Sequence, residues 1–236
     1  MQFENKIKER RDKNPFVQNT DLAYDLLLEC IISGELKPGD KILQDEYANK
    51  LNMSRTPIRD ALIQLERDGY IRGSGQKSFA VSQIYYSDYA EISKFRSLLE
   101  EYAVRYAAKN FDEAYFQKMS SNIKRMQELK KEPDRGVIAE KFLPLDFEFH
   151  ELIVLGSSNT YLINAYNAIS PRYHFYQSII RREEYNLLYT LQTHKRIYEA
   201  IYDRDEERAA RLIREHCGFY DTVKIQKIFE KKQQIR

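Results

Sequence analysis

The stretch NMSRTPIRDALIQLERDGYI, residues 52–71, determines the fold that the sequence predicts for the first third of the chain. Its apolar side chains follow the i, i+3, i+4, i+7 spacing of an amphipathic helix, at Ile58, Ala61, Leu62 and Leu65. Pro57 comes directly before this apolar stripe. Proline is tolerated in the first turn of a helix, where backbone N–H groups have no intrahelical partner. With Ser54 as the N-cap, Pro57 therefore marks the entrance of the helix.

The segments around this helix predict a winged helix-turn-helix. A helix is expected from about residue 20, and the glycines and proline of SGELKPGD (33–40) end it. A second short helix is expected over about 44–51, followed by the turn NMS. After the central helix, YIRGSGQKSFAVSQI (70–84) predicts two short strands joined by a Gly/Ser tip. Residues 1–19 are expected to form a loosely ordered, partly helical arm before the winged helix of residues 20–82.

Two arginines indicate what this helix contacts. Arg55 and Arg59 are one turn apart beside the apolar stripe, in the part of a recognition helix that meets base edges in the major groove. Arginine pairs bidentately with guanine, and the hydroxyls of Ser54 and Thr56 reach phosphates or bases. Lys77, at the hairpin tip, suits a phosphate or the minor groove. The alternative is a small helical subdomain whose arginines are merely solvated.

Composition is that of a globular protein without a membrane partner. Of the 236 residues 42% are hydrophobic and 31% charged, and no run approaches the ~20 apolar residues that span a bilayer. The N-terminus has no apolar signal-peptide core, so we expect a cytoplasmic protein. Cys30 and Cys217 fit no metal or redox spacing and are expected to be buried thiols. Because the net charge is only +2, the DNA prediction depends on the motif and not on bulk charge.

Beyond about Tyr86 the sequence predicts an all-α antiparallel helical bundle. Glycine and proline become scarce there, and strand-like alternation disappears. Six helices are expected near residues 87–109, 112–131, 137–155, 160–181, 184–203 and 205–233. The fold class is therefore mainly α, with a second domain over residues 86–236 for metal binding, effector binding and dimerisation.

Three of the four histidines fall on the apolar stripes of three different predicted helices: His150, His194 and His216. Asp146 lies one turn before His150. A lone histidine on an apolar face is ordinarily a hydrogen-bonded core residue, but several buried imidazoles and a carboxylate together need shared partners. A divalent metal satisfies them at once, with zinc first and nickel, manganese or iron as alternatives. His174 stands just off its stripe and is taken as structural.

Arg96 also points inward, in the stripe Ile92, Arg96, Leu99, Ala103, and a buried guanidinium requires an anion. Two partners are possible. One is an internal salt bridge to a glutamate such as Glu100. The other is the carboxylate of a small ligand, which a guanidinium binds in bidentate fashion.

Residues 26–81 resemble the N-terminal domain of the GntR family of bacterial transcription regulators. They carry the family's G-x-L-x-P-G turn, S-R-T-P-[IV]-R entrance, L-x-x-L-E-x-x-G-[LY]-[IV] exit and glycine-containing wing. The resemblance implies DNA contacts from Ser54, Arg55, Thr56 and Arg59, with Gly75 and Gln76 at the wing tip. One departure is Lys77-Ser78 before Phe79, where many relatives have Arg-Gly.

Residues 82–236 resemble the FadR-type C-terminal effector-binding domain, called FCD. The shared motifs are F-R-x-x-L-E at 95–100, D-x-x-x-H at 146–150, S-x-N at 157–159, H-x-x-I-x-x-A-I at 194–201 and the final His216. The resemblance implies a metal site and a small-carboxylate site. The metal ligands would be Asp146, His150, His194 and His216, and the effector would contact Arg96 and Asn159.

These features together predict a homodimeric, DNA-binding transcription regulator on a pseudo-palindromic operator. Its operator affinity would change when a small carboxylate effector binds with the metal. Two alternatives stay open, namely a metalloenzyme that uses the three histidines and Asp146 for hydrolysis, and a regulator with a purely structural metal. Four protein ligands count against the enzyme, because catalytic zinc usually keeps three. Arg96→Ala is expected to abolish the ligand response and leave folding intact.

Overall fold

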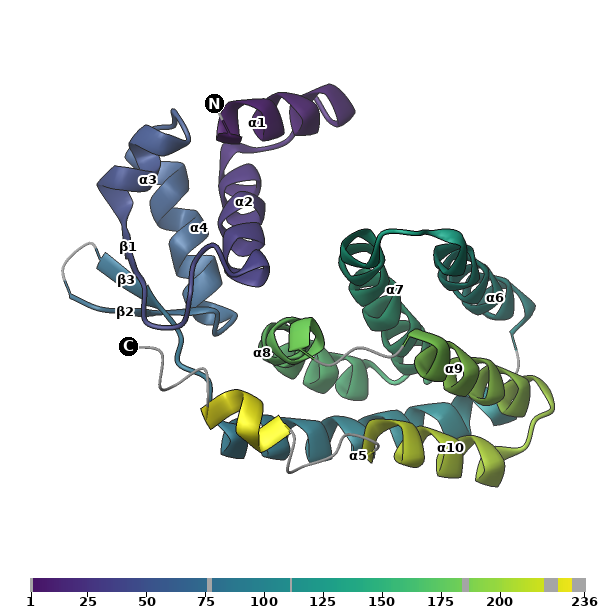
Figure 1. Cartoon of the computed structure of the whole chain (residues 1–236). Helices are drawn as coiled ribbons and strands as arrows, with labels where there is room; N and C mark the ends of the chain where they lie inside the picture. The colour runs from purple at the N-terminus through teal and green to yellow at the C-terminus, as the bar shows by residue number, and fades with distance from the viewer. Residues whose placement is uncertain (1, 76–77, 111, 184–186, 219–224, 231–236) are drawn as a thin grey trace. The chain divides into compact units, whose positions relative to one another are not determined.

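The computed structural model describes residues 2–75, 78–110, 112–183, 187–218 and 225–230 (Figure 1). The chain divides into two compact units, Met1–Ile84 and Tyr85–Arg236. Within the described ranges, no helix is both long and apolar enough to cross a membrane. Most of the described residues are helical, as the sequence predicts.

The first unit is a winged helix-turn-helix preceded by one further helix. Its elements in order are α1 (Gln2–Lys13), α2 (Asn19–Ser33), β1 (Lys41–Leu43), α3 (Gln44–Lys50), α4 (Arg55–Arg67), β2 (Ile71–Gly73) and β3 (Ser78–Val81). The predicted hairpin is present as β2 and β3, with Arg72 opposite Ala80. The sequence reading missed β1, which makes this a three-stranded antiparallel sheet in the order β1-β3-β2. A three-residue strand with one buried side chain, Ile42, is too short to show alternation.

The central helix α4 begins where the proline argument places it. Ser54 is the N-cap in extended conformation and Pro57 is the third helical residue. All four residues of the apolar stripe are buried, and the helix packs against α2. Each fully buried leucine or isoleucine contributes about 1.5–3 kcal/mol. The buried stripe thereby leaves the opposite, arginine-bearing side of the first turn in solvent.

The arm that the sequence predicts to be partly helical contains one regular helix, α1, and ion pairs hold this helix against α2. Lys6 Nζ lies 2.6 Å from Glu29 Oε1, and Arg10 Nη2 lies 2.9 Å from Glu29 Oε2. The sequence did not predict that this helix packs on α2, because α1 is strongly polar and has no apolar stripe.

The second unit is an all-α bundle. Its helices are α5 (Tyr86–Lys109), α6 (Glu113–Glu128), α7 (Arg135–Gly156), α8 (Thr160–Glu183), α9 (Leu187–Tyr202) and α10 (Glu206–Gly218), with the 3-10 turn η1 (Leu129–Lys131) after α6. Residues 225–230 are also helical, and Phe229 packs its ring against Tyr86 and Tyr89 of α5. Part of the helix predicted for 205–233 falls on residues 219–224 and 231–233, which lie outside the described ranges.

Helix α5 is the centre of this bundle. It packs against α7, α8, α9 and α10, and α10 runs alongside it (Figure 1). The apolar core is built from the inward faces of these helices and includes Phe142, Phe149 and Ile197, all with no exposed surface. This packing brings the polar residues of α5, α7, α9 and α10 together inside an apolar shell.

Candidate functional site

The first turn of α4 presents the residues predicted to contact DNA. Ser54, Arg55, Thr56 and Arg59 are all exposed. Ser54 makes no capping hydrogen bond, although it is the N-cap. Arg55 Nε lies 2.9 Å from Asp45 Oδ1 of α3 in an exposed ion pair. Such a pair contributes at most about 1 kcal/mol, so Arg55 is readily released to another anion.

The wing tip is only partly described. Gly75 is exposed with φ at 119°, a backbone conformation that L side chains rarely adopt. Gln76 and Lys77, the other two residues predicted at the tip, lie outside the described residues. Glu66 of α4 accepts a 2.6 Å hydrogen bond from the backbone N–H of Gly73, which ties the base of the wing to the helix.

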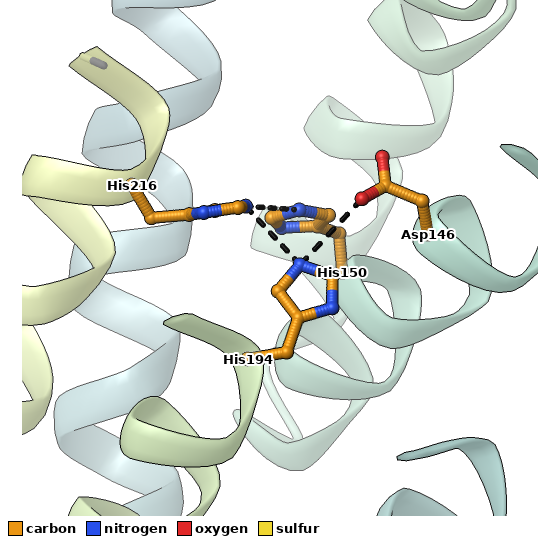
Figure 2. A group of neighbouring side chains, drawn as sticks. All are labelled: Asp146, His150, His194 and His216. Atoms are coloured by element: carbon orange, nitrogen blue, oxygen red, sulfur yellow. Dashed lines mark hydrogen bonds and ion pairs between the residues drawn. The ribbon is translucent and has the colours of Figure 1, made fainter. Parts of the chain in front are cut away.

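The four residues predicted as metal ligands converge in the second unit. Figure 2 shows Asp146 and His150 from α7, His194 from α9 and His216 from α10 pointing at one another. His216 Nε2 lies 3.2 Å from His194 Nε2 and 3.2 Å from His150 Nε2. Asp146 Oδ1 lies 3.6 Å from His194 Nε2. All four side chains are buried, and their candidate ligand atoms lie within 4.8 Å of one another.

The hydrogen bonds behind two of these histidines determine which ring nitrogen faces the centre. His150 Nδ1 lies 2.6 Å from Glu100 Oε2, and His216 Nδ1 lies 3.0 Å from Thr193 Oγ1. Thr193 donates its hydroxyl to the carbonyl of Thr190, so its oxygen accepts from His216. In both histidines the proton therefore sits on Nδ1, and the lone pair of Nε2 points into the cluster.

This donor set fits a divalent metal. The Nε2 lone pairs of His150 and His216, 3.2 Å apart, repel each other unless a cation lies between them, and Asp146 adds a buried carboxylate. A tetrahedral ion with metal–nitrogen bonds of about 2.0–2.1 Å would separate its ligand nitrogens by roughly 3.3 Å. Imidazole and carboxylate together suit zinc, nickel, manganese or iron.

Arg96 lies beside this cluster and is buried, with 4% of its surface exposed. Its Nε donates to Glu100 Oε1 at 2.5 Å, and its guanidinium lies 4.0 Å from the centre of the Tyr173 ring. Nη2 is buried and has no hydrogen-bond partner within the described structure. The internal salt bridge is therefore present, and one donor of the guanidinium still lacks an acceptor.

Glu100 is an ionised carboxylate in this arrangement. Burial would raise its pKa, but the neighbouring Arg96 guanidinium and then His150 hold the pKa below its usual range. Burial likewise opposes the charge on Arg96, and Glu100 raises the pKa of the guanidinium well above its ordinary value. The side chain of Glu100 has no exposed surface, and both of its oxygens are used.

Two other predicted residues have local roles. Asn159 Oδ1 accepts hydrogen bonds from the backbone N–H groups of Tyr161 and Leu162, so this asparagine caps α8. His174 stacks on Phe147 with ring centres 3.6 Å apart. Burial, and then Arg96 and His150, lower the pKa of His174 to about 3, so it stays neutral.

Family models match both units. Residues 19–81 match the bacterial regulatory proteins of the gntR family, and residues 91–219 match the FCD domain. The chain belongs to the GntR family, with an FCD domain. Proteins of this kind are transcription regulators and not enzymes, so this GntR protein is a DNA-binding transcription regulator.

Individual relatives agree with this assignment. The GntR protein is 28% identical to YdhC of Bacillus subtilis, an uncharacterized HTH-type transcriptional regulator, over 88% of this chain and 91% of YdhC. It is 26% identical to a probable D-xylose utilization operon transcriptional repressor of Paenarthrobacter nicotinovorans, over 83% and 84% of the two chains. Among solved structures, McbR/YncC of E. coli has a TM-score of 0.70 at 20% identity, over 90% of this chain and 99% of that one, and shares the fold.

Sequence reasoning missed two residues of the FCD site. Glu100 entered only as a possible partner of Arg96, and Thr193 not at all. For Glu100 a signal was available, since it lies four residues after Arg96 on the same helix face. Its contact with His150, fifty residues later, has no local signal in the sequence.

Proposed function

We propose that this GntR protein represses or activates transcription in response to a small carboxylate that binds beside a divalent metal in the FCD domain. The proposal rests on the buried cluster of three Nε2 atoms and one carboxylate. Beside it lies the buried Arg96, whose Nη2 has no hydrogen-bond acceptor within the described structure. Asp146, His150, His194 and His216 would hold the metal. When bound, the metal supplies positive charge for a carboxylate oxygen.

The effector class follows from the charges around Arg96. Glu100 accepts the hydrogen bond of the guanidinium Nε, and the buried Nη2 has no acceptor among the residues that the structure describes. Burying such a donor unpaired costs about 1–3 kcal/mol, which an anionic acceptor recovers. A carboxylate matches both the guanidinium and a divalent metal. Because Asn159 caps α8, we leave it out of the proposed effector contacts.

On DNA, we propose that Arg55 and Arg59 read bases in the major groove, with Ser54 and Thr56 at the backbone. The exposure of all four on the first turn of α4 supports this assignment. Gly75, Gln76 and Lys77 are proposed as the wing contact. The near-neutral charge of the chain makes specific contacts important, because non-specific attraction to phosphates is weak.

Homodimerisation is proposed through α5. Phe95, Leu98, Tyr102 and Tyr106 lie on one side of this helix and are 45%, 65%, 53% and 38% exposed. A contiguous row of large apolar side chains in solvent is typical of a protein interface. A homodimer carries two recognition helices, which matches the two half-sites of a pseudo-palindromic operator, about 34 Å apart.

The proposal is tested by operator binding with and without carboxylates. Selection from random duplexes identifies the operator, and zinc-loaded protein is then titrated onto it with a panel of small mono-, di- and tricarboxylates. At least one is expected to change the operator Kd by about 5–150-fold. If none does while zinc still binds, the metal is structural and the effector hypothesis is wrong.

Arg96→Lys refines this test. Lysine keeps the charge beside Glu100 but loses the planar fork that binds a carboxylate at two points. We expect the variant to bind the operator normally and to lose the carboxylate response. Arg105→Lys, on the same helix and paired with Glu101 and Glu207, is the matched control and should respond as the unmodified protein does.

A further inference from the structure

Glu100 contacts both halves of the proposed site, the metal group and Arg96. Its Oε1 accepts from Arg96 Nε at 2.5 Å, and its Oε2 accepts from His150 Nδ1 at 2.6 Å. Cys217 Sγ is 3.6 Å from the same Oε2. A fully buried carboxylate between two strong donors is held in a single orientation, because each oxygen has its own partner.

This arrangement has a consequence for His150. A neutral imidazole carries one proton, and whichever nitrogen donates it leaves the other as the lone pair. With Nδ1 donating to Glu100, Nε2 is the acceptor that faces His216 at 3.2 Å. If the atom of residue 100 that contacts Nδ1 were a donor, the proton of His150 would move to Nε2 and block metal binding.

We propose that Glu100 is a positioning residue shared by the metal and effector groups. Its Oε2 fixes the tautomer and orientation of His150 for the metal. Its Oε1 holds the guanidinium of Arg96 by the Nε edge, which leaves Nη2 for a ligand carboxylate. Metal binding and carboxylate binding are coupled through this one side chain. The inference rests on the proposed metal site and adds the residue that links it to Arg96.

Glu100→Gln tests the inference sharply. A glutamine has one acceptor oxygen and one donor NH₂ group, so it cannot accept from Arg96 and His150 at once. Arginine is always protonated and takes the oxygen, so the NH₂ group faces His150 and forces its proton onto Nε2. Zinc affinity, measured by competition with a chromophoric chelator, is expected to fall at least 10–100-fold. Nitrogen-15 NMR of the metal-free variant should show His150 protonated on Nε2.

Glu101→Gln is the matched control. Glu101 is the next residue, and it pairs with Arg105 and Arg214 away from the cluster. Its zinc affinity should stay within about twofold of the unmodified protein. Equal zinc affinity in the Glu100→Gln and unmodified proteins would overturn the role of Glu100 alone. Absence of zinc binding by the unmodified protein would overturn the metal site as well.

A double variant separates positioning from a general structural effect. In Arg96→Met/Glu100→Gln the guanidinium no longer competes for the glutamine oxygen, which can therefore accept from His150 Nδ1. Replacing a buried ion pair by uncharged side chains of similar size is also well tolerated. The double variant should recover zinc affinity to within about tenfold of the unmodified protein, even if Glu100→Gln alone fails to fold. A folded double variant that binds zinc more than 100-fold more weakly would contradict the proposal.

Discussion

Arg59 and Arg67 are exposed arginines at opposite ends of the same helix, α4, and only Arg59 lies in the turn proposed to meet base edges. Arg59→Ala is expected to weaken binding to the selected operator by about 1–3 kcal/mol and to relax its sequence preference. Arg67→Ala removes the same charge from the last turn and should lower the affinity for all duplexes slightly and to the same extent. The measurement is operator and random-duplex Kd at a fixed salt concentration. Equal losses for both variants would contradict base reading by Arg59.

For another single residue, Arg96, the structure changes the expected stability of the Arg96→Ala variant. The sequence reading expects this variant to fold normally, but Arg96 is the buried counter-ion of Glu100. Removing one partner of a buried ion pair leaves the other uncompensated, so we expect the free energy of unfolding to fall by about 3–5 kcal/mol. Denaturant melts of Arg96→Ala against Arg96→Lys measure the difference. Equal midpoints for the two variants would mean that Glu100 finds another partner.

At the scale of single elements, Asn159 directly precedes α8 and caps its first turn. Its side-chain oxygen accepts from two backbone N–H groups of the first turn, at 3.1 and 3.2 Å. Asn159→Ala should therefore lower the free energy of unfolding by about 1 kcal/mol and leave the carboxylate response unchanged. Asn159→Asp retains the cap and serves as the control. Loss of the carboxylate response in both variants, with stability unchanged, would return Asn159 to the effector site.

Helix α5 has one face in the core and another in solvent, and the second face carries Leu98 and Tyr102. Leu98→Asp combined with Tyr102→Asp places two charges in the proposed interface and should convert the proposed dimer to monomers, as measured by light scattering. Operator affinity should fall with it, because each monomer reads only a half-site. Tyr161→Asp, at an aromatic that is 88% exposed on α8, is the control and should remain dimeric. A dimer that survives the double change would place the interface elsewhere.

At the scale of the whole molecule, the metal is expected to stabilise the second unit alone. All four proposed ligands lie between α7 and α10, within Tyr85–Arg236. A metal at 100 times its Kd adds about 2.7 kcal/mol to the unit that binds it. Chelation with EDTA should therefore increase hydrogen exchange in α7, α9 and α10 and leave α2 and α4 unchanged. Equal changes in both units would contradict a metal site confined to the second unit.

The elements themselves were largely readable from the sequence, and particular residues show why. The spacing of Ile58, Ala61, Leu62 and Leu65 predicts α4, and Pro57 marks its start, because both signals depend on neighbours within one or two turns. Strand β1 and the packing of α1 on α2 were not predicted, because neither has such a signal. Helix α1 is held by ion pairs to Glu29, and β1 by pairing with β3.

The sequence by itself determined the winged helix, the helical bundle and the identity of four candidate ligands, since helical period and residue type are local properties. The tertiary structure alone decided how those ligands meet. The distance of 3.2 Å between Nε2 atoms depends on how α7, α9 and α10 pack around α5. The same packing places Glu100 against His150, fifty residues away in the chain. Contacts between distant segments leave no periodic pattern in the sequence. Which oxygen of Glu100 contacts Arg96 and which contacts His150 therefore becomes visible only when the helices are packed.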